Sequence, residues 1–388
     1  MRKVRLGDVV NIKGGGTPDK STPEYWGGTI PWASVKDFKS TEINTTTDSI
    51  TQLGVSNSST NIIPAGTIII PTRMAVGKAA INSIDLAINQ DLKALFPKSD
   101  IFTRYLLNFL LASSTKLEKQ AFGATVKGIT LEILKNLEIP LPPIAEQKRI
   151  AEILDRAEEI RSKRREAIAQ LNTLNQAIFL EMFGDPVTNP KGWSLLYFND
   201  LLSMPLRNGL SPSNTGKVTS KVLTLSAITG NAFDEKAWKS STFQSVPPIT
   251  QRVDQSDFLI CRGNGNIQLV GKGYFPTRQM PEMTFPDTII AARILPELIE
   301  RQFLQHIWNS RAVRRQLETL ARTTNGTFKV NQTMLEGIVL VVPPLPLQSE
   351  FAHRVEAVEK LKATHRASLS ELDALFASLQ HRAFRGEL

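Results

Sequence analysis

The chain of 388 residues has little of the chemistry that equips a secreted, membrane-bound or metal-containing protein. Its single cysteine, Cys261, excludes an internal disulfide framework and is typical of the reducing cytoplasm, where we expect the protein. Four scattered histidines and one cysteine do not form a zinc cluster. The longest apolar runs, 105–112 and 338–347, are shorter than the ~20 residues of a membrane helix. The first eight residues are basic without an apolar run behind them, so we expect no secretory signal there.

Motifs for chemistry on DNA or nucleotides are also missing. Amino-methyltransferases use an Asp/Asn-Pro-Pro-aromatic loop, but the three Pro-Pro pairs here follow Leu141, Val246 and Val342. Gly77-Lys78 and Gly271-Lys272 lack the upstream glycine and following Ser/Thr of a phosphate-binding loop. Asp91-Leu92-Lys93 matches the carboxylate-x-Lys tripeptide of nucleases, but one such match is expected by chance in a chain of this length. We therefore expect no catalytic site in this chain.

What the sequence does contain is an internal repeat. Ile139-Pro140-Leu141-Pro142-Pro143 and Val341-Val342-Pro343-Pro344-Leu345 each precede a long helical pattern, and Pro142 corresponds to Pro343, 201 residues later. Upstream, Val76-Gly77-Lys78 recurs as Val270-Gly271-Lys272, and each turn is expected to begin a buried strand. The shared order of these features indicates a duplicated unit: a mixed globular domain, a proline-rich hinge and a helix.

The two helical stretches, 146–183 and 349–384, contain neither glycine nor proline and would each span roughly 50–57 Å. Their apolar residues alternate three and four apart, which is the heptad pattern of helices that pair along their length. Arg164 and His365 interrupt the two stripes at equivalent positions, which indicates a polar layer that sets the register. The predicted seam consists of Ile153, Ile160, Arg164, Leu171, Leu174, Ile178, Val358, Leu361, His365, Leu372, Leu375 and Leu379.

The net charge of +9 is confined to the globular parts. Residues 146–183 carry seven basic and seven acidic side chains, and residues 346–388 carry six of each. Residues 1–145 carry sixteen basic against twelve acidic side chains, and residues 184–345 carry seventeen against twelve. Two basic bodies on neutral helices are the charge distribution expected of a protein that reads a two-part polyanion.

Three segments in each globular part combine turn residues, cations and hydrogen-bonding side chains, which suit phosphates and base edges. They are 14–36, 72–74 and 125–127 in the first part, and 225–231, 261–266 and 323–331 in the second. Solvated hairpin loops are the alternative for any single residue, and Trp26 and Trp32 also suit a core. The candidate DNA-contacting residues are Lys13, Thr17, Lys20, Trp32, Ser34, Lys36, Arg73, Lys78, Lys127, Ser226, Arg262, Asn264, Asn266, Lys272, Asn325, Lys329 and Asn331.

Several local motifs resemble those of HsdS, the specificity subunit of type I restriction-modification systems. The resemblance covers essentially the whole chain. It rests on Leu6-Gly7-Asp8, Gly15-Gly16-Thr17-Pro18, Tyr25-Trp26-Gly27-Gly28, Ile30-Pro31-Trp32, Val76-Gly77-Lys78-Ala79-Ala80, Glu146-Gln147-Lys148-Arg149-Ile150, Phe183-Gly184-Asp185-Pro186, Lys191-Gly192-Trp193 and Arg382-Ala383-Phe384-Arg385-Gly386-Glu387-Leu388. The second half lacks the Gly-Gly-Thr-Pro and Tyr-Trp-Gly-Gly signatures, so the two recognition domains should read different half-sites.

The resemblance implies an α+β fold with two mixed α/β target-recognition domains in a pseudo-twofold arrangement, separated by two long antiparallel coiled-coil helices. The expected boundaries are 1–145 for the first domain, 146–184 for the central helix, 185–345 for the second domain and 346–388 for the C-terminal helix. The resemblance also implies double-stranded DNA, two methylation (HsdM) subunits and restriction (HsdR) subunits as partners. S-adenosylmethionine, ATP and Mg²⁺ are expected on those partners, and no cofactor or metal on this chain.

Three other interpretations remain at this point. The chain could be an enzyme that carries its own recognition domains, which methyl transfer by the isolated chain would reveal. It could serve a different DNA-modification or phage-defence system, which the neighbouring genes would identify. It could be a coiled-coil adaptor without a nucleic-acid role, which salt-dependent, sequence-selective DNA binding would exclude.

Overall fold

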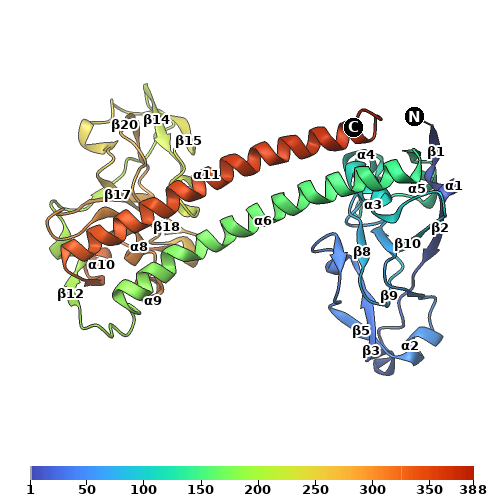
Figure 1. Cartoon of the computed structure of the whole chain (residues 1–388). Helices are drawn as coiled ribbons and strands as arrows, with labels where there is room; N and C mark the ends of the chain where they lie inside the picture. Colours follow the sequence, from blue (N-terminus) through green and yellow to red (C-terminus); the bar gives the residue numbers. More distant parts are fainter. Residues whose placement is uncertain (1, 124, 325) are drawn as a thin grey trace. The chain divides into compact units, whose positions relative to one another are not determined.

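The computed structural model describes residues 2–123, 125–324 and 326–388. The chain folds as two compact units (Figure 1): unit 1 comprises residues 1–167 and 365–388, and unit 2 comprises residues 168–364. Each unit therefore contains one globular body together with part of both long helices, α6 (Ile144–Phe183) and α11 (Leu345–Ala383). These units cut across the four segments expected from the sequence, because each helix contributes residues to both units.

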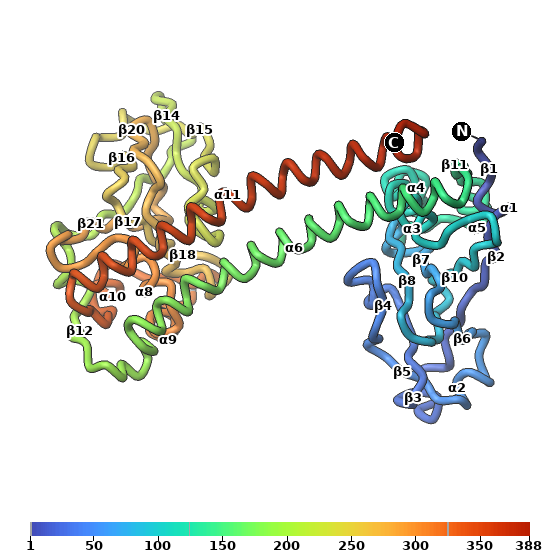
Figure 2. Tube along the Cα trace, in the orientation of Figure 1, coloured from blue at the N-terminus to red at the C-terminus, as the bar shows by residue number. Residues whose placement is uncertain are grey.

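Three sheets form the globular body of unit 1, with short helices between their strands in the chain (Figure 2). A five-stranded sheet has the order β2-β10-β7-β8-β4, a four-stranded sheet has the order β5-β3-β9-β6, and β1 pairs with β11. The strands are β1 (Lys3–Arg5), β2 (Val10–Gly14), β3 (Trp26–Ala33), β4 (Glu42–Ile43), β5 (Asp48–Ile50), β6 (Ile62–Ile63), β7 (Ile68–Pro71), β8 (Ala80–Asn82), β9 (Leu86–Ile88), β10 (Leu92–Pro97) and β11 (Glu138–Pro140). The helices are α1 (Leu6–Val9), α2 (Gln52–Ser56), α3 (Thr103–Ala112), α4 (Ser114–Gln120) and α5 (Leu131–Lys135).

Unit 2 repeats this topology. Its sheet β13-β21-β17-β19 matches β2-β10-β7-β8, its sheet β15-β14-β20-β16 matches β5-β3-β9-β6, and β12 pairs with β24 as β1 pairs with β11. A further three-stranded sheet has the order β18-β23-β22. The strands are β12 (Ser194–Tyr197), β13 (Arg207–Asn208), β14 (Val218–Leu223), β15 (Trp238–Phe243), β16 (Arg252–Val253), β17 (Asp257–Cys261), β18 (Gly263–Asn264), β19 (Gly273–Tyr274), β20 (Met280–Thr284), β21 (Ile289–Arg293), β22 (Arg322–Thr324), β23 (Thr327–Lys329) and β24 (Val339–Val342). The helices are α7 (Ser226–Thr229), α8 (Arg301–Trp308), α9 (Arg311–Leu320) and α10 (Gln332–Glu336).

Strand directions agree as well as strand order. In each four-stranded sheet the two central strands run parallel to each other: β3 with β9 in unit 1, and β14 with β20 in unit 2. The last strand is antiparallel in both, β6 with β9 and β16 with β20. The duplication predicted from the order of motifs is therefore confirmed at the level of sheet topology.

The two long helices follow from the absence of glycine and proline within them. α6 begins just after Pro142-Pro143 and ends where Gly184 adopts a left-handed φ of 78°. α11 begins at Leu345 rather than at the predicted Ser349, with Pro346 inside its first turn. A proline is tolerated there because the first backbone N–H groups of a helix have no intrahelical partner.

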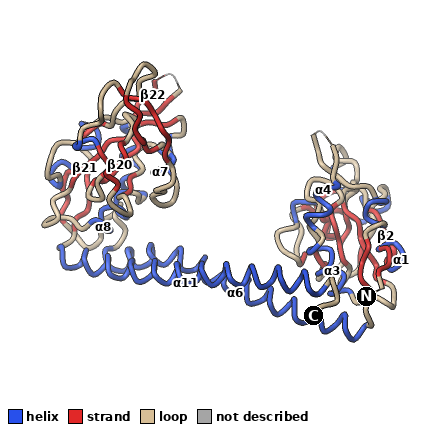
Figure 3. Tube along the Cα trace, turned by 90° about the horizontal axis from the view of Figure 1, so that it is seen from above, coloured by secondary structure: helices blue, strands red, loops and turns tan. Residues whose placement is uncertain are grey.

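Each unit's core encloses the ends of both long helices. In unit 1 the buried cluster contains Leu154 of α6 and Ala383 of α11, with Phe384 packed on it. In unit 2 the cluster contains Phe179 and Phe183 of α6 and Phe351 of α11. The helices run along one side of each globular body (Figure 3), so their buried ends fix them to it. No helix in the described part of the chain combines the length and apolar composition needed to cross a membrane.

Candidate nucleic-acid interface

Two of the three predicted segments of unit 1 lie side by side. Arg73 forms an antiparallel bridge with Gly128, and the amide of Met74 donates to the carbonyl of Lys127 at 3.0 Å. A side chain at Gly128 would come within 3.0 Å of Cγ of Arg73, so glycine leaves room for the arginine. The Arg73 side chain is 59% exposed, although its Nη1 lies 3.8 Å from Oδ1 of Asp91. Arg73 and Lys127 are thus two exposed cations on adjoining backbone.

The corresponding segments of unit 2 also meet. Gly263 and Asn264 in β18 pair with Lys329 and Phe328 in β23, and the amide of Val330 donates to the carbonyl of Arg262 at 2.9 Å. A side chain at Gly263 would come within 3.1 Å of Cγ of Lys329, so a glycine again faces a cation, with the two exchanged between the segments relative to Arg73 and Gly128. Asn325, another candidate, lies outside the described residues.

Some candidates shape these loops with their side chains. Oδ1 of Asn264 accepts from the amide of Asn266, and Oδ1 of Asn266 accepts from the amide of Gln268, both at 2.9–3.0 Å. Asn331 caps α10 by accepting from the amide of Met334. Nη1 of Arg262 donates to the carbonyl of Asp287 at 3.1 Å. These contacts hold the segment around Lys329 in one conformation, which favours a preformed surface.

The third segment of unit 1 is divided between surface and core. Lys13, Lys20 and Lys36 are exposed, whereas Trp32 and Ser34 are buried. The indole of Trp32 donates to the carbonyl of Gly16 at 3.1 Å, and Ser34 forms a capping box with Asp37. Trp32 and Ser34 therefore lack the exposure that DNA contact needs, and for Trp32 the core interpretation holds. Two other candidates bond to neighbours at the surface: Thr17 to Gln90, and Ser226 to Thr224 at 2.7 Å.

The lysines of the two Val-Gly-Lys turns have equivalent structural roles. Nζ of Lys78 donates to the carbonyl of Phe38 at 3.0 Å, and Nζ of Lys272 donates to the carbonyls of Thr229 and Gly230. Gly77 and Gly271 have φ angles of 91° and 78°, which favour glycine, and the strands β8 and β19 follow as predicted. Both lysines thus hold a neighbouring loop, whether or not they also reach a phosphate.

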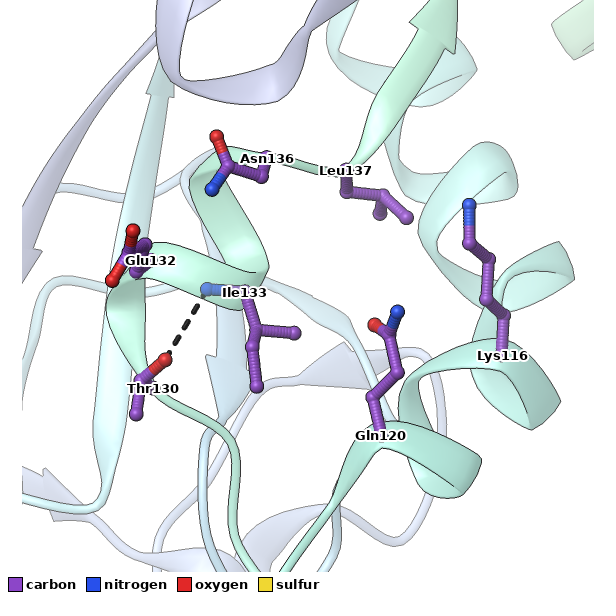
Figure 4. A pocket seen from close by; sticks show the side chains of 7 residues that line it. All are labelled: Lys116, Gln120, Thr130, Glu132, Ile133, Asn136 and Leu137. Atoms are coloured by element: carbon purple, nitrogen blue, oxygen red, sulfur yellow. Dashed lines mark hydrogen bonds between the residues drawn. The ribbon is translucent and has the colours of Figure 1, made fainter.

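Two cavities lie outside the paired segments. The first, about 270 Å³, lies between α4 and α5 of unit 1 (Figure 4) and contains none of the candidate residues: it is lined by Lys116, Gln120, Thr130, Glu132, Ile133, Asn136 and Leu137. The second, about 240 Å³, lies in unit 2 beside Lys272 and Arg314. Nη1 of Arg314 donates to the carbonyl of Val270, and burial lowers the pKa of its guanidinium.

The tripeptide 91–93 has no catalytic arrangement. Asp91 faces Arg73, whereas Nζ of Lys93 donates to the carbonyls of Gln90 and Leu92 at 2.6 and 3.0 Å. Burial lowers the pKa of Lys93. The described residues also contain no group of three or more His, Cys, Asp or Glu side chains placed to hold a metal ion.

A pair of buried glutamines joins each long helix to its globular body, and the sequence reasoning missed their role. Gln147 of α6 accepts from the amide of Phe102 at 2.8 Å and donates to the carbonyls of Asp100 and Pro142 at 2.9 Å. Gln348 of α11, 201 residues later, makes the same three contacts with Glu300, Leu298 and Pro343. The signal was present, because both glutamines follow a Pro-Pro pair at the same spacing.

The helices pair, but along a seam rotated from the predicted one. In unit 1, Arg161 of α6 bonds to Asp373 of α11 and lies 4.2 Å from the centroid of the Phe376 ring. In unit 2, the amide of Asn175 donates to Glu359 at 2.9 Å. Four predicted seam residues are instead exposed by 39–53%: Ile160, Leu174, Leu361 and Leu375.

The polar layer was predicted correctly. Nη1 of Arg164 lies 2.9 Å from Nδ1 of His365, so residues at equivalent positions of the two repeats touch each other. Of the other predicted seam residues, Ile153, Leu171, Ile178, Leu372 and Leu379 are half-buried and Val358 is buried. Contacts that join the first half of α6 to the last part of α11 mean that the helices run antiparallel, as the resemblance implied.

Comparisons with known proteins agree with this geometry. Residues 1–173 match the family described as type I restriction modification DNA specificity domain. The chain is 34% identical over 178 residues, 44% of each chain, to the type I restriction enzyme EcoR124I/EcoR124II specificity subunit of Escherichia coli. It is 29% identical over 221 residues, 52% of this chain and 51% of the relative, to the MjaIX specificity subunit of Methanocaldococcus jannaschii. The matched part thus spans about half the length of these two curated relatives.

A solved structure extends the likeness in fold to the whole chain. It is the type I restriction-modification S subunit from M. genitalium, with a TM-score of 0.58 and 15% identity over 99% of this chain and 96% of that one. The fold class predicted from the sequence is therefore confirmed, and so is the resemblance to type I specificity subunits.

Proposed function

We propose that this chain is the specificity subunit of a type I restriction-modification enzyme, because residues 1–173 match the model of the type I restriction modification DNA specificity domain. Each unit reads one half of a two-part target on double-stranded DNA. The long helices set the gap between the two half-sites, and partner subunits perform the chemistry. As a DNA-binding subunit it would work in the cytoplasm.

One observation carries the proposal that both units read DNA. At equivalent places of two equivalent topologies, segments far apart in sequence meet through backbone pairing and present cations. These are the exposed Arg73 and Lys127 in unit 1, and in unit 2 the exposed Lys329 beside the half-buried Arg262. Arginine suits guanine edges and phosphates, while lysine suits phosphates. Two preformed cationic surfaces on duplicated scaffolds are what a bipartite reader needs.

The two surfaces differ, which supports an asymmetric target. In unit 1 the arginine lies opposite a glycine, Gly128, whereas in unit 2 a lysine, Lys329, lies opposite a glycine, Gly263. Unit 2 adds the strand β22 and the asparagines Asn264 and Asn266 beside this pairing. Different side chains at matching places would read different bases.

The exposed apolar residues on the helices support a role in assembly. In two antiparallel helices, the residues that come directly before a contact position on either helix lie on the same face of the helix pair. Ile160 precedes Arg161, and Leu375 precedes Phe376, so both lie on one face of the pair in unit 1. Leu174 and Leu361 are the equivalent pair in unit 2. Two matching apolar patches would seat two copies of one methylation subunit.

The cofactors follow from this division of labour. S-adenosylmethionine would be bound by the methylation subunits, and ATP with Mg²⁺ by restriction subunits that join through them. This chain would hold no cofactor and would supply DNA recognition alone.

The test is methylome sequencing of cells that express the chain together with methylation subunits. We expect adenine methylation in an asymmetric two-part target with a fixed gap. Arg73→Ala should relax one half-site and Arg262→Ala the other, each by the roughly 1–3 kcal/mol of a bidentate contact to guanine. Arg311→Ala, an exposed change on α9, is the control. Methylation of one uninterrupted sequence, or both variants relaxing the same half-site, would refute the proposal.

A further inference from the structure

Unit 2 carries an exposed cationic ribbon that the analysis of motifs did not single out. β14 and β15 form an antiparallel hairpin with six residue pairs, from Val218 opposite Phe243 to Leu223 opposite Trp238. The buried cluster that contains Leu223, Met280 and Met283 of this sheet includes no described residue of α6 or α11, which pack instead in the other cluster of unit 2; the sheet is at the top of unit 2 in Figures 1 and 2. The ribbon face is therefore not used for attachment to the helices.

Side chains that bind polyanions gather on its exposed face. Thr219 and Lys221 of β14 are exposed, and Ser240 of β15 pairs opposite Lys221. Nζ of Lys221 lies 4.7 Å from the ring centroid of Trp238, whose side chain is 40% exposed. An ammonium, two hydroxyls and a partly open indole thus share one face.

The charge of the ribbon has one sign. Residues 217–223 and 236–243 together contain four lysines and no acidic residue. In the connecting segment, Glu235 accepts from Nε of Arg278 at 3.2 Å, and Asp234 accepts from the amide of Lys236 at 3.0 Å. These acids are engaged next to the ribbon rather than on it, so they leave its positive face in place.

The fold itself does not require these lysines. The topologically equivalent strands of unit 1, β3 and β5, contain no lysine or arginine, and β5 begins with Asp48. The same four-stranded sheet forms without cations in one unit and with them in the other. A ligand of unit 2 explains the difference better than the stability of the sheet does.

We propose that the exposed face of the β14–β15 ribbon binds the DNA backbone at the half-site read by unit 2. Lysine and hydroxyl groups are the side chains that contact phosphates. The inference rests on the proposed function and adds that the two units bind DNA with unequal electrostatic strength. The partner is double-stranded DNA, and an acidic protein surface is the alternative that the test must separate.

The first test uses the assembled methyltransferase complex and the variant Lys221→Gln, which removes the one strand lysine on the face shared with Ser240 and Trp238. A lost phosphate contact lowers the dependence of log Kd on log salt by about 0.9, so we expect the slope to fall by about 0.9. The sequence preference should not change, because phosphates carry no base information. Lys221→Arg should keep the slope of the unchanged protein.

The matched control is Lys163→Gln, which removes the same charge from an exposed lysine that pairs with Glu159 of its own helix. Its slope should be that of the unchanged complex. An unchanged slope for the ribbon variant would overturn the inference, and so would loss of methylation subunits with normal DNA binding. Absence of sequence-selective binding by the unchanged complex would instead refute the proposed function.

A second test locates the ribbon by crosslinking. Cys261 is fully buried and its pKa is raised to about 11 by burial, so a photoactivatable thiol reagent should ignore it at neutral pH. Labelled Ser240→Cys should then crosslink to DNA that carries the target. Labelled Ser49→Cys, on the equivalent strand of unit 1, is the comparison. Equal yields at the two positions, or no DNA crosslink at position 240, would overturn the inferred difference.

Discussion

At the scale of single residues, buried polar side chains join the helices to the globular bodies. Gln147 and Gln348 each satisfy one backbone amide and two carbonyl groups with a single side chain. Both side chains are completely buried, and each makes one fully buried hydrogen bond, to the carbonyl of Pro142 or of Pro343. Their identical partners in the two units show that the attachment of the helix was duplicated together with the sheet.

Gln147→Ala should therefore destabilise unit 1 by roughly 1–3 kcal/mol, because it leaves the buried carbonyl of Pro142 without a partner and removes two part-buried hydrogen bonds. Gln348→Ala should affect unit 2 in the same way. Hydrogen exchange of the strands measures the two units separately. Gln176→Ala, an exposed change on α6, is the control and should be neutral. Equal loss of protection in both units from either variant would show that the glutamines do not act locally.

His306 gives unit 2 a pH dependence. Its ring stacks on Phe179, and burial lowers its pKa to about 4 from 6.5. Between these values the unfolded chain binds a proton that the folded chain does not, so stability is complete above pH 6.5 and decreases as pH falls toward 4. Denaturant midpoints at pH 7.5 and 5 should differ more for the unchanged protein than for His306→Phe. His381→Gln, a change at an exposed histidine, should keep the same difference between the two midpoints as the unchanged protein. If His381→Gln abolishes that difference, the assignment to His306 is wrong.

At the scale of elements, the long helices were predictable and their exact contact face was not. The absence of glycine and proline, the Pro-Pro hinges and the repeat spacing were sufficient for the helices. The predicted seam differs from the observed one because Arg161 and Lys362 bury their long side chains at the contact face of the helices. A prediction from apolar residues alone does not include such buried cations. Lys362 is 5% exposed, whereas the neighbouring Leu361 is 46% exposed.

Sheet pairing was also beyond the sequence analysis, because the strands pair through contacts between residues far apart in the chain. The repeat nevertheless predicted that segments 72–74 and 125–127 have counterparts in the second half. In each unit the two segments lie next to each other through backbone pairing. Trp32 and Ser34 were misassigned because a short loop beside a strand does not reveal which side chains turn inward. The ribbon β14–β15 was missed because it has no counterpart of matching chemistry in the first repeat.

The exposed apolar patches on the helices lead to a prediction about assembly. Ile160→Glu should remove one methylation subunit and Leu361→Glu the other, since each changes the patch of one unit. Native mass spectrometry of the purified complex counts the subunits. Ser162→Glu, an exposed change on the other side of the Arg161 seam position, should leave two methylation subunits in the complex. Two retained subunits in both patch variants would exclude this face as their seat.

At the scale of the whole molecule, the helices should act as a ruler. Inserting four residues into α6 adds about 6 Å, so the gap between half-sites should change by about one or two base pairs. The half-site bases should stay the same, and methylome sequencing reads both. The same insertion in the exposed loop at 214–215 is the control. Altered half-site bases at a constant gap would contradict the ruler.

Unit 1 is built from the first 167 and the last 24 residues of the chain, and this has a consequence for synthesis on the ribosome. Phe376, Leu379 and Ala383 belong to its core, yet they emerge after all of unit 2. At ordinary translation rates the first half of α6 waits roughly 10–40 s for its partner. The unit that begins to form first is thus completed last, and a chain released just before residue 365 would carry a finished unit 2 beside an unfinished unit 1.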